Sequence, residues 1–264
     1  MDTETVSILS QRGTSIPADI VSADGQGGLL MLAHGFKAER TEDGRFTAVA
    51  EQMAKEGFHS IRMDFPGCGN SKEPFLAYSL KHCLEDMESC YAYMKEHYPL
   101  NGHLYLLGYS MGGRLISLFL KKHPEVQKLV FWAACNRAFG PDDFFLEQSF
   151  RKLKEQCDRE GSCDFYDIFT QETDKMSSTF VNDMLEMDAL SPLESFTGDA
   201  LIIQGDHDRT IEIENAQWIY GHLKNASCRK LHYIHDADHG FGIWDGRTQD
   251  SEELVQTTIS FLKG

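Results

Sequence analysis

The five residues 108–112, Gly-Tyr-Ser-Met-Gly, constrain the fold of this chain more than any other segment. The apolar residues 103–109 predict a strand that ends in this segment, and residues 115–120 predict a helix that follows it. A serine in a sharp turn between a strand and a helix stands clear of its neighbours, and the flanking Gly108 and Gly112 leave room for the crowded backbone. We therefore predict Ser110 as a nucleophile held at the start of a helix, whose N–H groups face developing negative charge.

Strand-like and helix-like patterns alternate through most of the 264 residues. Eight segments are predicted as strands: 6–10, 18–23, 29–34, 58–65, 103–109, 128–135, 200–204 and 230–235. The helices predicted between and after them cover 46–57, 80–94, 115–120, 213–223 and 251–262. Alternation of this kind predicts the α/β class, with a mostly parallel eight-stranded sheet that carries helices on both faces.

The alternation is interrupted between residues 137 and 195. This stretch is rich in charged and aromatic residues and contains two expected helices, near 142–157 and 177–187. We interpret residues 137–195 as a lid or cap inserted into a core of residues 1–136 and 196–264; the alternative is a long surface excursion. Its aromatic side chains favour an apolar substrate, although more of them are expected to pack together than to touch a ligand. They include Phe139, Phe144, Phe145 and Phe150.

A serine becomes a strong nucleophile only when a nearby base takes its proton. Where a serine follows a strand in this way, the acid and then the histidine come later in the chain. The predicted strand 200–204 leads into Gly-Asp-His-Asp at 205–208, at a carboxyl end where ligand sites form in such sheets. We predict Asp208 as the acid. Asp206 is the alternative, with a role in bracing the loop favoured for it.

The predicted strand 230–235 leads into the loop that contains His239. We predict His239 as the general base, with Nε2 toward Ser110 and Nδ1–H toward Asp208. His235 lies at the strand end and is the alternative. His34 follows an earlier strand and is expected to anchor its loop, because the base is expected late in the chain.

An oxyanion formed during acyl transfer needs two preorganised N–H donors. The amide of Met111, directly after the nucleophile, is one predicted donor. The loop after strand 29–34 is expected to supply the other, and Phe36 is the predicted residue.

The formal net charge of −16 argues against nucleic acid and anionic membrane surfaces as partners. The first residues lack the pattern of a secretory signal, and no apolar run is long enough to span a membrane. The seven cysteines form no C-x-x-C pair, which favours free thiols in the cytoplasm over a metal site. A bridge between Cys157 and Cys163 is a minor alternative. No metal or cofactor is expected, and the sequence leaves a homodimer open.

Taken together, five motifs resemble those of α/β-hydrolases. They are H-G-F at 34–36, R-M-D-F-P-G-C-G-N-S at 62–71, G-Y-S-M-G-G at 108–113, G-D-H-D at 205–208 and D-H-G-F at 238–241. Within that superfamily the chain resembles the bacterial cinnamoyl/feruloyl esterase-like group. It also resembles the overlapping serine aminopeptidase-like (S33-type) and monoacylglycerol lipase-like hydrolases. The resemblance covers most of the core and little of residues 137–195.

The resemblance implies hydrolysis of small-molecule carboxylic esters, small or aromatic in the acid part, through an acyl-enzyme. Feruloyl-type relatives often carry Gln after the nucleophile, where this chain has Met111, and that change alters the lining of the acyl pocket. Amide or peptide hydrolysis and a monoacylglycerol lipase-like activity are the enzymatic alternatives. A binding module that kept the fold without activity is a third hypothesis.

Overall fold

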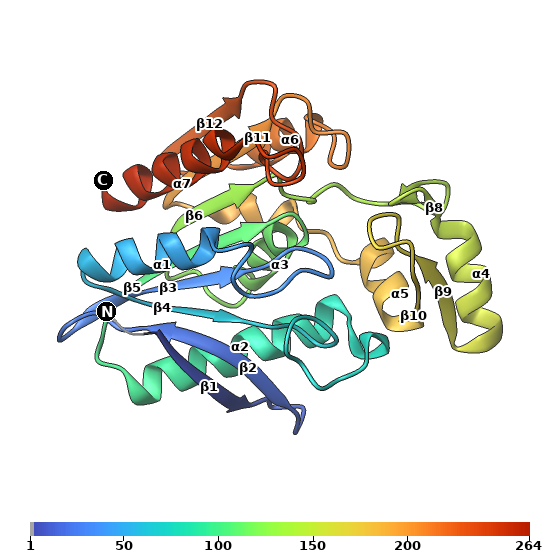
Figure 1. Cartoon of the computed structure of the whole chain (residues 1–264), viewed down its shortest axis with the longest axis horizontal. Coiled ribbons are helices and arrows are strands. Elements are labelled where there is room, and N and C mark those ends of the chain that lie inside the picture. The colour runs from blue at the N-terminus through green and yellow to red at the C-terminus, as the bar shows by residue number, and fades with distance from the viewer. Residues whose placement is uncertain (1–2) are drawn as a thin grey trace.

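The computed structural model describes residues 3–264 and contains one eight-stranded sheet (Figure 1). Its order is β1-β2-β4-β3-β5-β6-β11-β12; β2 is antiparallel to both of its neighbours, and all other pairs are parallel. This confirms the predicted mostly parallel sheet. The strands are β1 (Thr3–Leu9), β2 (Ser15–Val21), β3 (Gly27–Ala33), β4 (Phe58–Met63), β5 (Leu100–Tyr109), β6 (Val126–Trp132), β11 (Asp199–Gly205) and β12 (Cys228–Ile234).

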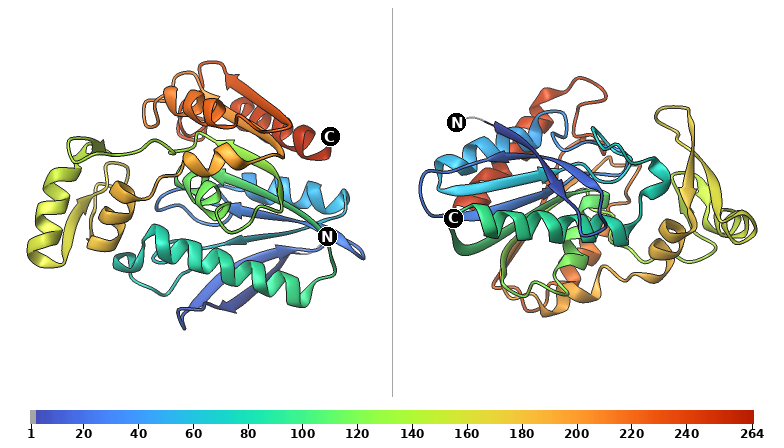
Figure 2. Two further views of the ribbon diagram at one scale, coloured as in Figure 1. Left: turned by 180° about the vertical axis from the view of Figure 1, so that it is seen from behind. Right: turned by 90° about the horizontal axis from the view of Figure 1, so that it is seen from below.

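Helices cover both faces of the sheet (Figures 1 and 2). Successive side chains of a strand point to opposite faces, and β3 shows the result. Leu29 and Met31 pack in a cluster with α2 (Leu80–His97), α3 (Met111–Phe119) and α6 (Glu214–His222). Leu30 and Leu32 pack in a second cluster with α1 (Arg45–Lys55) and α7 (Thr248–Lys263). Every residue of β3 is buried, as expected for a parallel strand covered on both sides.

Residues 137–195 lie in the chain between β6 and β11 and project beyond the carboxyl ends of the parallel strands (Figure 1). The segment contains β7 (Phe144–Phe145), β8 (Gln148–Ser149), α4 (Phe150–Glu160), β9 (Ser162–Tyr166), β10 (Thr173–Ser177), α5 (Ser178–Glu186) and the 3₁₀ helix η2 (Ser191–Ser195). Strands β7 and β8 pair with each other, and so do β9 and β10.

The helix expected near 142–157 is wrong over its first eight residues, because α4 begins only at Phe150. Leu146 and Glu147 adopt left-handed φ values of 44° and 66°, which reverse the chain into the β7–β8 hairpin. The second expected helix, near 177–187, corresponds to α5. The β9–β10 pair and the short 3₁₀ helix η1 (Phe75–Ala77) were not predicted.

Within residues 3–264, no helix is long and apolar enough to cross a membrane. All seven cysteines lie in the described part of the chain and are free thiols, including Cys157 and Cys163.

Candidate active site

Ser110 stands in a strained turn between β5 and α3. Its backbone has φ 51° and ψ −114°, a conformation that L-residues rarely adopt. A Cβ atom on Gly112 would lie 1.9 Å from the carbonyl oxygen of Ala33, and one on Gly108 would lie 2.4 Å from the backbone of residue 112. Both positions therefore require glycine, and together they allow α3 to approach β3 and β5 closely.

A continuous chain of hydrogen bonds joins Ser110 to His239 and Asp208. The Nε2 atom of His239 lies 3.1 Å from Ser110 Oγ, and its Nδ1 atom lies 2.7 Å from Asp208 Oδ2. With the imidazole proton on Nδ1, the ring donates to the carboxylate and accepts from the serine hydroxyl. The three residues follow the carboxyl ends of β5, β11 and β12.

The side chain of Asp208 is buried and accepts several hydrogen bonds. Its Oδ1 atom accepts the amides of Thr210 and Ile211, both at 2.8 Å, and its Oδ2 atom accepts Gln204 Nε2 at 2.8 Å. These bonds fix the orientation of the carboxyl group, so that Oδ2 points at His239 Nδ1.

The backbone and ring of His239 are also held in place. The hydroxyl of Tyr109 donates to the His239 carbonyl oxygen at 2.9 Å, and the two rings stack with centroids 5.2 Å apart. Tyr109, which directly precedes Ser110, therefore helps to fix both the backbone and the ring of His239.

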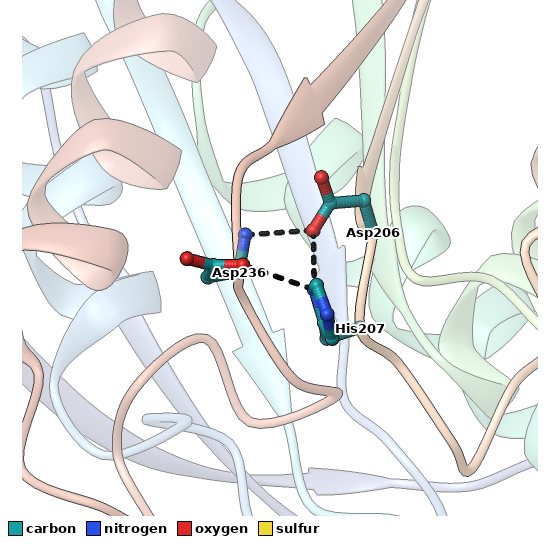
Figure 3. Close-up of side chains that lie close together, drawn as sticks. All are labelled: Asp206, His207 and Asp236. Atoms are coloured by element: carbon teal, nitrogen blue, oxygen red, sulfur yellow. Dashed lines mark hydrogen bonds and ion pairs between the residues drawn. The ribbon is translucent and has the colours of Figure 1, made fainter.

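Asp206 and His235, the two alternatives, form a separate cluster at the surface. Asp206 accepts hydrogen bonds from His207 Nδ1 at 2.9 Å and from the Asp236 amide at 2.6 Å (Figure 3). It also accepts one from His235 Nδ1 at 2.9 Å. The bonds from the two imidazoles lower the pKa of Asp206 to about 2, and the bond to Asp206 raises the pKa of His235. This cluster braces the loops after β11 and β12, and the structure does not bring it to Ser110.

The same loops hold the only described group of side chains whose atoms lie close enough to share a metal ion: Asp206, His207 and Asp236 (Figure 3). All three are at least partly exposed and already bond to one another. No sequence pattern indicated this group, because its members come from two different loops.

His34 is fully buried and anchors the loop after β3. Its Nδ1–H donates to the Gly35 carbonyl oxygen at 2.8 Å, and its Nε2 accepts the Phe65 amide at 3.1 Å. Burial lowers the pKa of His34, consistent with a neutral ring that donates through one nitrogen and accepts through the other.

A pocket of about 210 Å³ opens beside the serine. Ser110, His239 and the two predicted oxyanion residues, Phe36 and Met111, all line it. The segment 137–195 contributes a further part of the wall, with Phe145, Leu146, Asp167, Phe169 and Thr170.

Of the four phenylalanines singled out in the sequence, only Phe145 lines this pocket. Phe139 and Phe150 are buried and pack against Phe145, whereas Phe144 is largely exposed. The expectation that more of these rings pack together than reach the site fits this arrangement.

Two aromatic residues at the pocket were missed. Phe169 from the β9–β10 loop and Trp244 from the loop after His239 have ring centroids 5.3 Å apart, and both are about half exposed. Trp244 is also 6.0 Å from the ring of His239. No sequence pattern relates residues 75 positions apart in two irregular loops, so only the folded chain reveals this pair.

The side chain of Phe36 connects the core to the segment 137–195. Its ring packs against Phe75 and Tyr78 of the core, at 5.4 Å each, and against rings of the segment at 5.2–5.5 Å. The rings from the segment are Phe145, Phe165 and Phe180. Sequence reasoning selected Phe36 for its amide alone and missed this contact.

Lys37, the next residue, forms an ion pair with the segment. Its Nζ lies 2.8 Å from Asp167 and 2.5 Å from Asp174. Burial opposes ionisation of Asp167, but bonds from Lys37 and from the amides of Phe169 and Thr170 outweigh it and lower the pKa.

Comparison with known proteins gives relatives of the same fold. Among solved structures, Est1E from Butyrivibrio proteoclasticus with bound ferulic acid is 19% identical, with 97% of each chain covered and a TM-score of 0.79. The α/β-hydrolase GrgF from Penicillium sp. sh18 is 14% identical, with 100% of this chain and 98% of the other covered and a TM-score of 0.79. The esterase EaEST from Exiguobacterium antarcticum is 20% identical, with 99% and 100% covered and a TM-score of 0.69.

A curated relative, the biotin biosynthesis bifunctional protein BioHC of Teredinibacter turnerae, is 21% identical over 153 residues. The match takes in 58% of this chain but only 25% of that protein. The sequence model described as serine aminopeptidase, S33, matches residues 26–157, which is half of the chain. The fold and this match show that the chain is an α/β-hydrolase of the S33 serine aminopeptidase family.

Proposed function

We propose that this hydrolase cleaves small-molecule carboxylic esters through an acyl-enzyme on Ser110. The observation that carries the proposal is the unbroken hydrogen-bond chain from Ser110 Oγ through His239 to Asp208. Each distance is within the range for proton transfer between a nucleophile, its base and the group that orients the base. Gly108 and Gly112 allow the sharp turn between β5 and α3 that exposes the Ser110 hydroxyl to the pocket.

In the first half of the reaction, Ser110 Oγ attacks the ester carbonyl while His239 Nε2 takes the hydroxyl proton. Asp208 holds the ring in the required tautomer and stabilises the imidazolium. The carbonyl oxygen becomes an oxyanion, which accepts hydrogen bonds from the amides of Phe36 and Met111. The Met111 amide is free for this because the first N–H groups of a helix have no partner within the helix.

His239 then gives its proton to the alcohol oxygen, the ester C–O bond breaks, and the alcohol leaves, which completes formation of the acyl-enzyme. Water then attacks the acyl-enzyme with His239 as base again, and the acid is released as the serine regains its proton. The triad and the two amides supply base, nucleophile and charge stabilisation, so the proposed reaction requires no cofactor.

The preference for esters is supported by the proteins that share the fold. Est1E is seen with ferulic acid bound, and EaEST is named an esterase. The rings of Phe145, Phe169 and Trp244 line the pocket and suit an aromatic or other apolar acyl group. Esters of small or aromatic acids are therefore the proposed substrates.

Amide or peptide hydrolysis is a second candidate, favoured by the family description of the matching sequence model. An aminopeptidase site needs a carboxylate for the substrate ammonium group. Two of the carboxylates at the pocket are already engaged, Asp167 with Lys37 and Glu42 with Arg45. Asp43 remains exposed beside them. Rates on p-nitrophenyl esters and on aminoacyl p-nitroanilides separate the two activities.

We also propose that residues 137–195 act as a cap on the core formed by residues 1–136 and 196–264. Residues 1 and 2 lie outside the described chain. The support is that the segment enters between β6 and β11 and supplies part of the pocket wall. The seven free thiols further support a reducing compartment such as the cytoplasm.

Replacement of the nucleophile tests the central proposal. The wild-type protein should react with a fluorophosphonate probe and hydrolyse p-nitrophenyl esters. Ser110→Ala should lose labelling and at least about 10⁴-fold in kcat, because removal of a triad member abolishes covalent catalysis. Thermal unfolding of both proteins shows that the fold is kept. Equal labelling of the two proteins would reject Ser110 as the nucleophile.

A further inference from the structure

The loop between β3 and α1 contains a buried carboxylate that the mechanism above does not use. Glu42 is only 3% exposed, and its Oε1 atom accepts the amide N–H of Gly35 at 2.7 Å. Gly35 directly precedes Phe36, the residue proposed to supply an oxyanion donor. The Phe36 amide itself bonds to no other residue in 3–264. Glu42 therefore fixes the loop through one amide and leaves the next amide free for a ligand.

Arg45 connects this carboxylate to the loop that carries the base. Its Nε donates to the Glu42 carbonyl oxygen and its Nη1 donates to the Gly240 carbonyl oxygen, both at 3.1 Å. Its Nη2 lies 3.4 Å from Glu42 Oε2. Gly240 directly follows His239, so a single guanidinium spans the distance between the two loops.

The guanidinium of Arg45 is also in contact with the residue before the nucleophile. It lies over the ring of Tyr109, 5.0 Å from the centroid, and the hydroxyl of Tyr109 in turn bonds to the carbonyl oxygen of His239. Glu42, Arg45 and Tyr109 thus form one buried network that reaches both sides of the site. Such a network limits the relative movement of the groups it joins.

The backbone at Glu42 has a strained conformation that glutamate rarely adopts. Glu42 and Asp43 both adopt left-handed φ values, 47° and 54°, which are uncommon for residues other than glycine. Strained backbone of this kind persists only where the surrounding contacts determine it, and it clusters at functional sites. Here the contacts are the buried bonds to Gly35 and Arg45.

We propose that Glu42 and Arg45 are positioning residues that set the oxyanion-binding amide of Phe36 in register with the general base His239. This inference rests on the proposed function, because it assigns a role in the same reaction. Neither residue is proposed to bond to the reacting atoms. An ionised Glu42 holds both the Gly35 amide and the Arg45 guanidinium more strongly than a neutral one, because hydrogen bonds to a charged group are about twice as strong.

The pH dependence of kcat distinguishes this positioning role from a purely structural one, because it should follow the ionisation of Glu42. Burial raises the pKa of Glu42 to about 7, against the opposing effects of the Gly35 N–H and of Arg45. The charged and titratable groups that face it are Arg45, Asp43, Glu39, Tyr109 and Cys68. A carboxylate with a raised pKa loses its charge as the pH falls through that value, so the positioning effect is present above about pH 7 and lost below it.

The test compares Glu42→Gln with wild type across the pH range, with an ester substrate. Glu42→Gln should lower kcat about tenfold at about pH 9 with KM unchanged, since misplacement of a catalytic group costs rate rather than substrate binding. The ratio of wild-type to variant kcat should fall to one at about pH 5, where wild-type Glu42 is protonated as well. Affinity for a trifluoromethyl ketone, which forms an oxyanion on the serine, should fall by the same factor.

The matched control is Glu51→Gln, the same chemical change at an exposed position of α1 outside the pocket. Its kcat should equal that of wild type at every pH. Arg45→Lys is the second variant: it keeps the charge but loses the fork that spans Glu42 and Gly240. It should lower kcat with KM unchanged even if Glu42→Gln does not fold.

A ratio of wild-type to Glu42→Gln kcat that does not change with pH would overturn this inference but not the proposed function. Equal kcat values for Glu42→Gln and Glu51→Gln would have the same consequence. Wild-type kcat in the Arg45→Lys variant would do the same. Lack of fluorophosphonate labelling in the wild-type protein would overturn the proposed function and this inference with it. The two failures are therefore distinguishable.

Discussion

The eight-stranded sheet and the segment 137–195 are stabilised in different ways. Strand β3 is buried along its whole length and is paired on both sides. Strands β9 and β10 pair only with each other and turn alternate side chains to solvent. Several ion pairs of the segment, such as Lys175 with Asp164, are exposed, and exposed pairs contribute only about 0–1 kcal/mol each.

Besides the apolar packing that the segment shares with the core, a few polar and aromatic side chains join the two. Phe36 enters its aromatic cluster, Lys37 pairs with Asp167 and Asp174, and Arg114 bonds to its backbone. Two of these three side chains belong to the loop proposed to bind the oxyanion. The sheet thus positions Ser110, His239 and Asp208, whereas the segment reaches the site through the loop of Phe36 and Lys37 and through the contact of Phe169 with Trp244.

The largest expected effect comes from Arg114, a fully buried residue of α3. Its guanidinium donates to the carbonyl oxygens of Cys135 and Arg137, where the chain enters the segment, and of Met184 and Met187, near its end. Arg114→Met leaves these oxygens without a donor and should lower the free energy of unfolding by about 3 kcal/mol. Urea unfolding measures the loss, and limited proteolysis should cut first within 137–195.

Arg151→Met is the control for this change. Arg151 belongs to the same segment but is exposed and pairs only with Asp142 at the surface. It should change the stability by less than about 0.5 kcal/mol. Similar stability and cleavage patterns for both variants would show that Arg114 does not fasten the segment.

The next effect separates packing from catalysis within the aromatic cluster. Phe36→Leu and Phe165→Leu each remove one ring from the same cluster and should each cost about 1–1.5 kcal/mol in the free energy of unfolding. Only Phe36 also lines the pocket and belongs to the loop proposed to bind the oxyanion, so only Phe36→Leu should lower kcat, by about tenfold. An equal loss of kcat in both variants would mean that the segment acts on the site by another route.

The smallest effect is expected at Lys37. Lys37→Met removes the partner of Asp167 and Asp174 and should cost about 1 kcal/mol, because the largely buried Asp167 keeps its bonds from the amides of Phe169 and Thr170. Hydrogen exchange in residues 167–172 should become faster. Because the folded-state pKa of Asp167 is lowered, the contribution of the pair is present at neutral pH and is lost as the pH falls through the acidic range.

Lys154→Met provides the comparison, since Lys154 pairs with Asp158 on α4, away from this loop. Exchange in residues 167–172 should stay as in wild type. If both variants leave this exchange unchanged, the ion pair of Lys37 does not restrain the loop.

Local patterns predicted the sheet because they depend on short-range physics. Buried parallel strands appear as short apolar runs, and all eight runs became strands of the sheet, with ends shifted by a few residues. The expected helix over 142–149 failed because left-handed residues 146 and 147 turn the chain there, and neither is a glycine that would have marked the turn.

The sequence by itself determined which residues stand at the strand ends and that glycines flank Ser110 at 108 and 112, since the order of the motifs is a property of the chain. Only the tertiary structure decided that Ser110, His239 and Asp208 meet, that Asp206 turns to His235 instead, and that Phe36 enters the segment. The buried contacts from Glu42 through Arg45 to Gly240 were likewise decided only by the tertiary structure. Such contacts join residues up to 195 positions apart, and their strength comes from burial that no local pattern encodes.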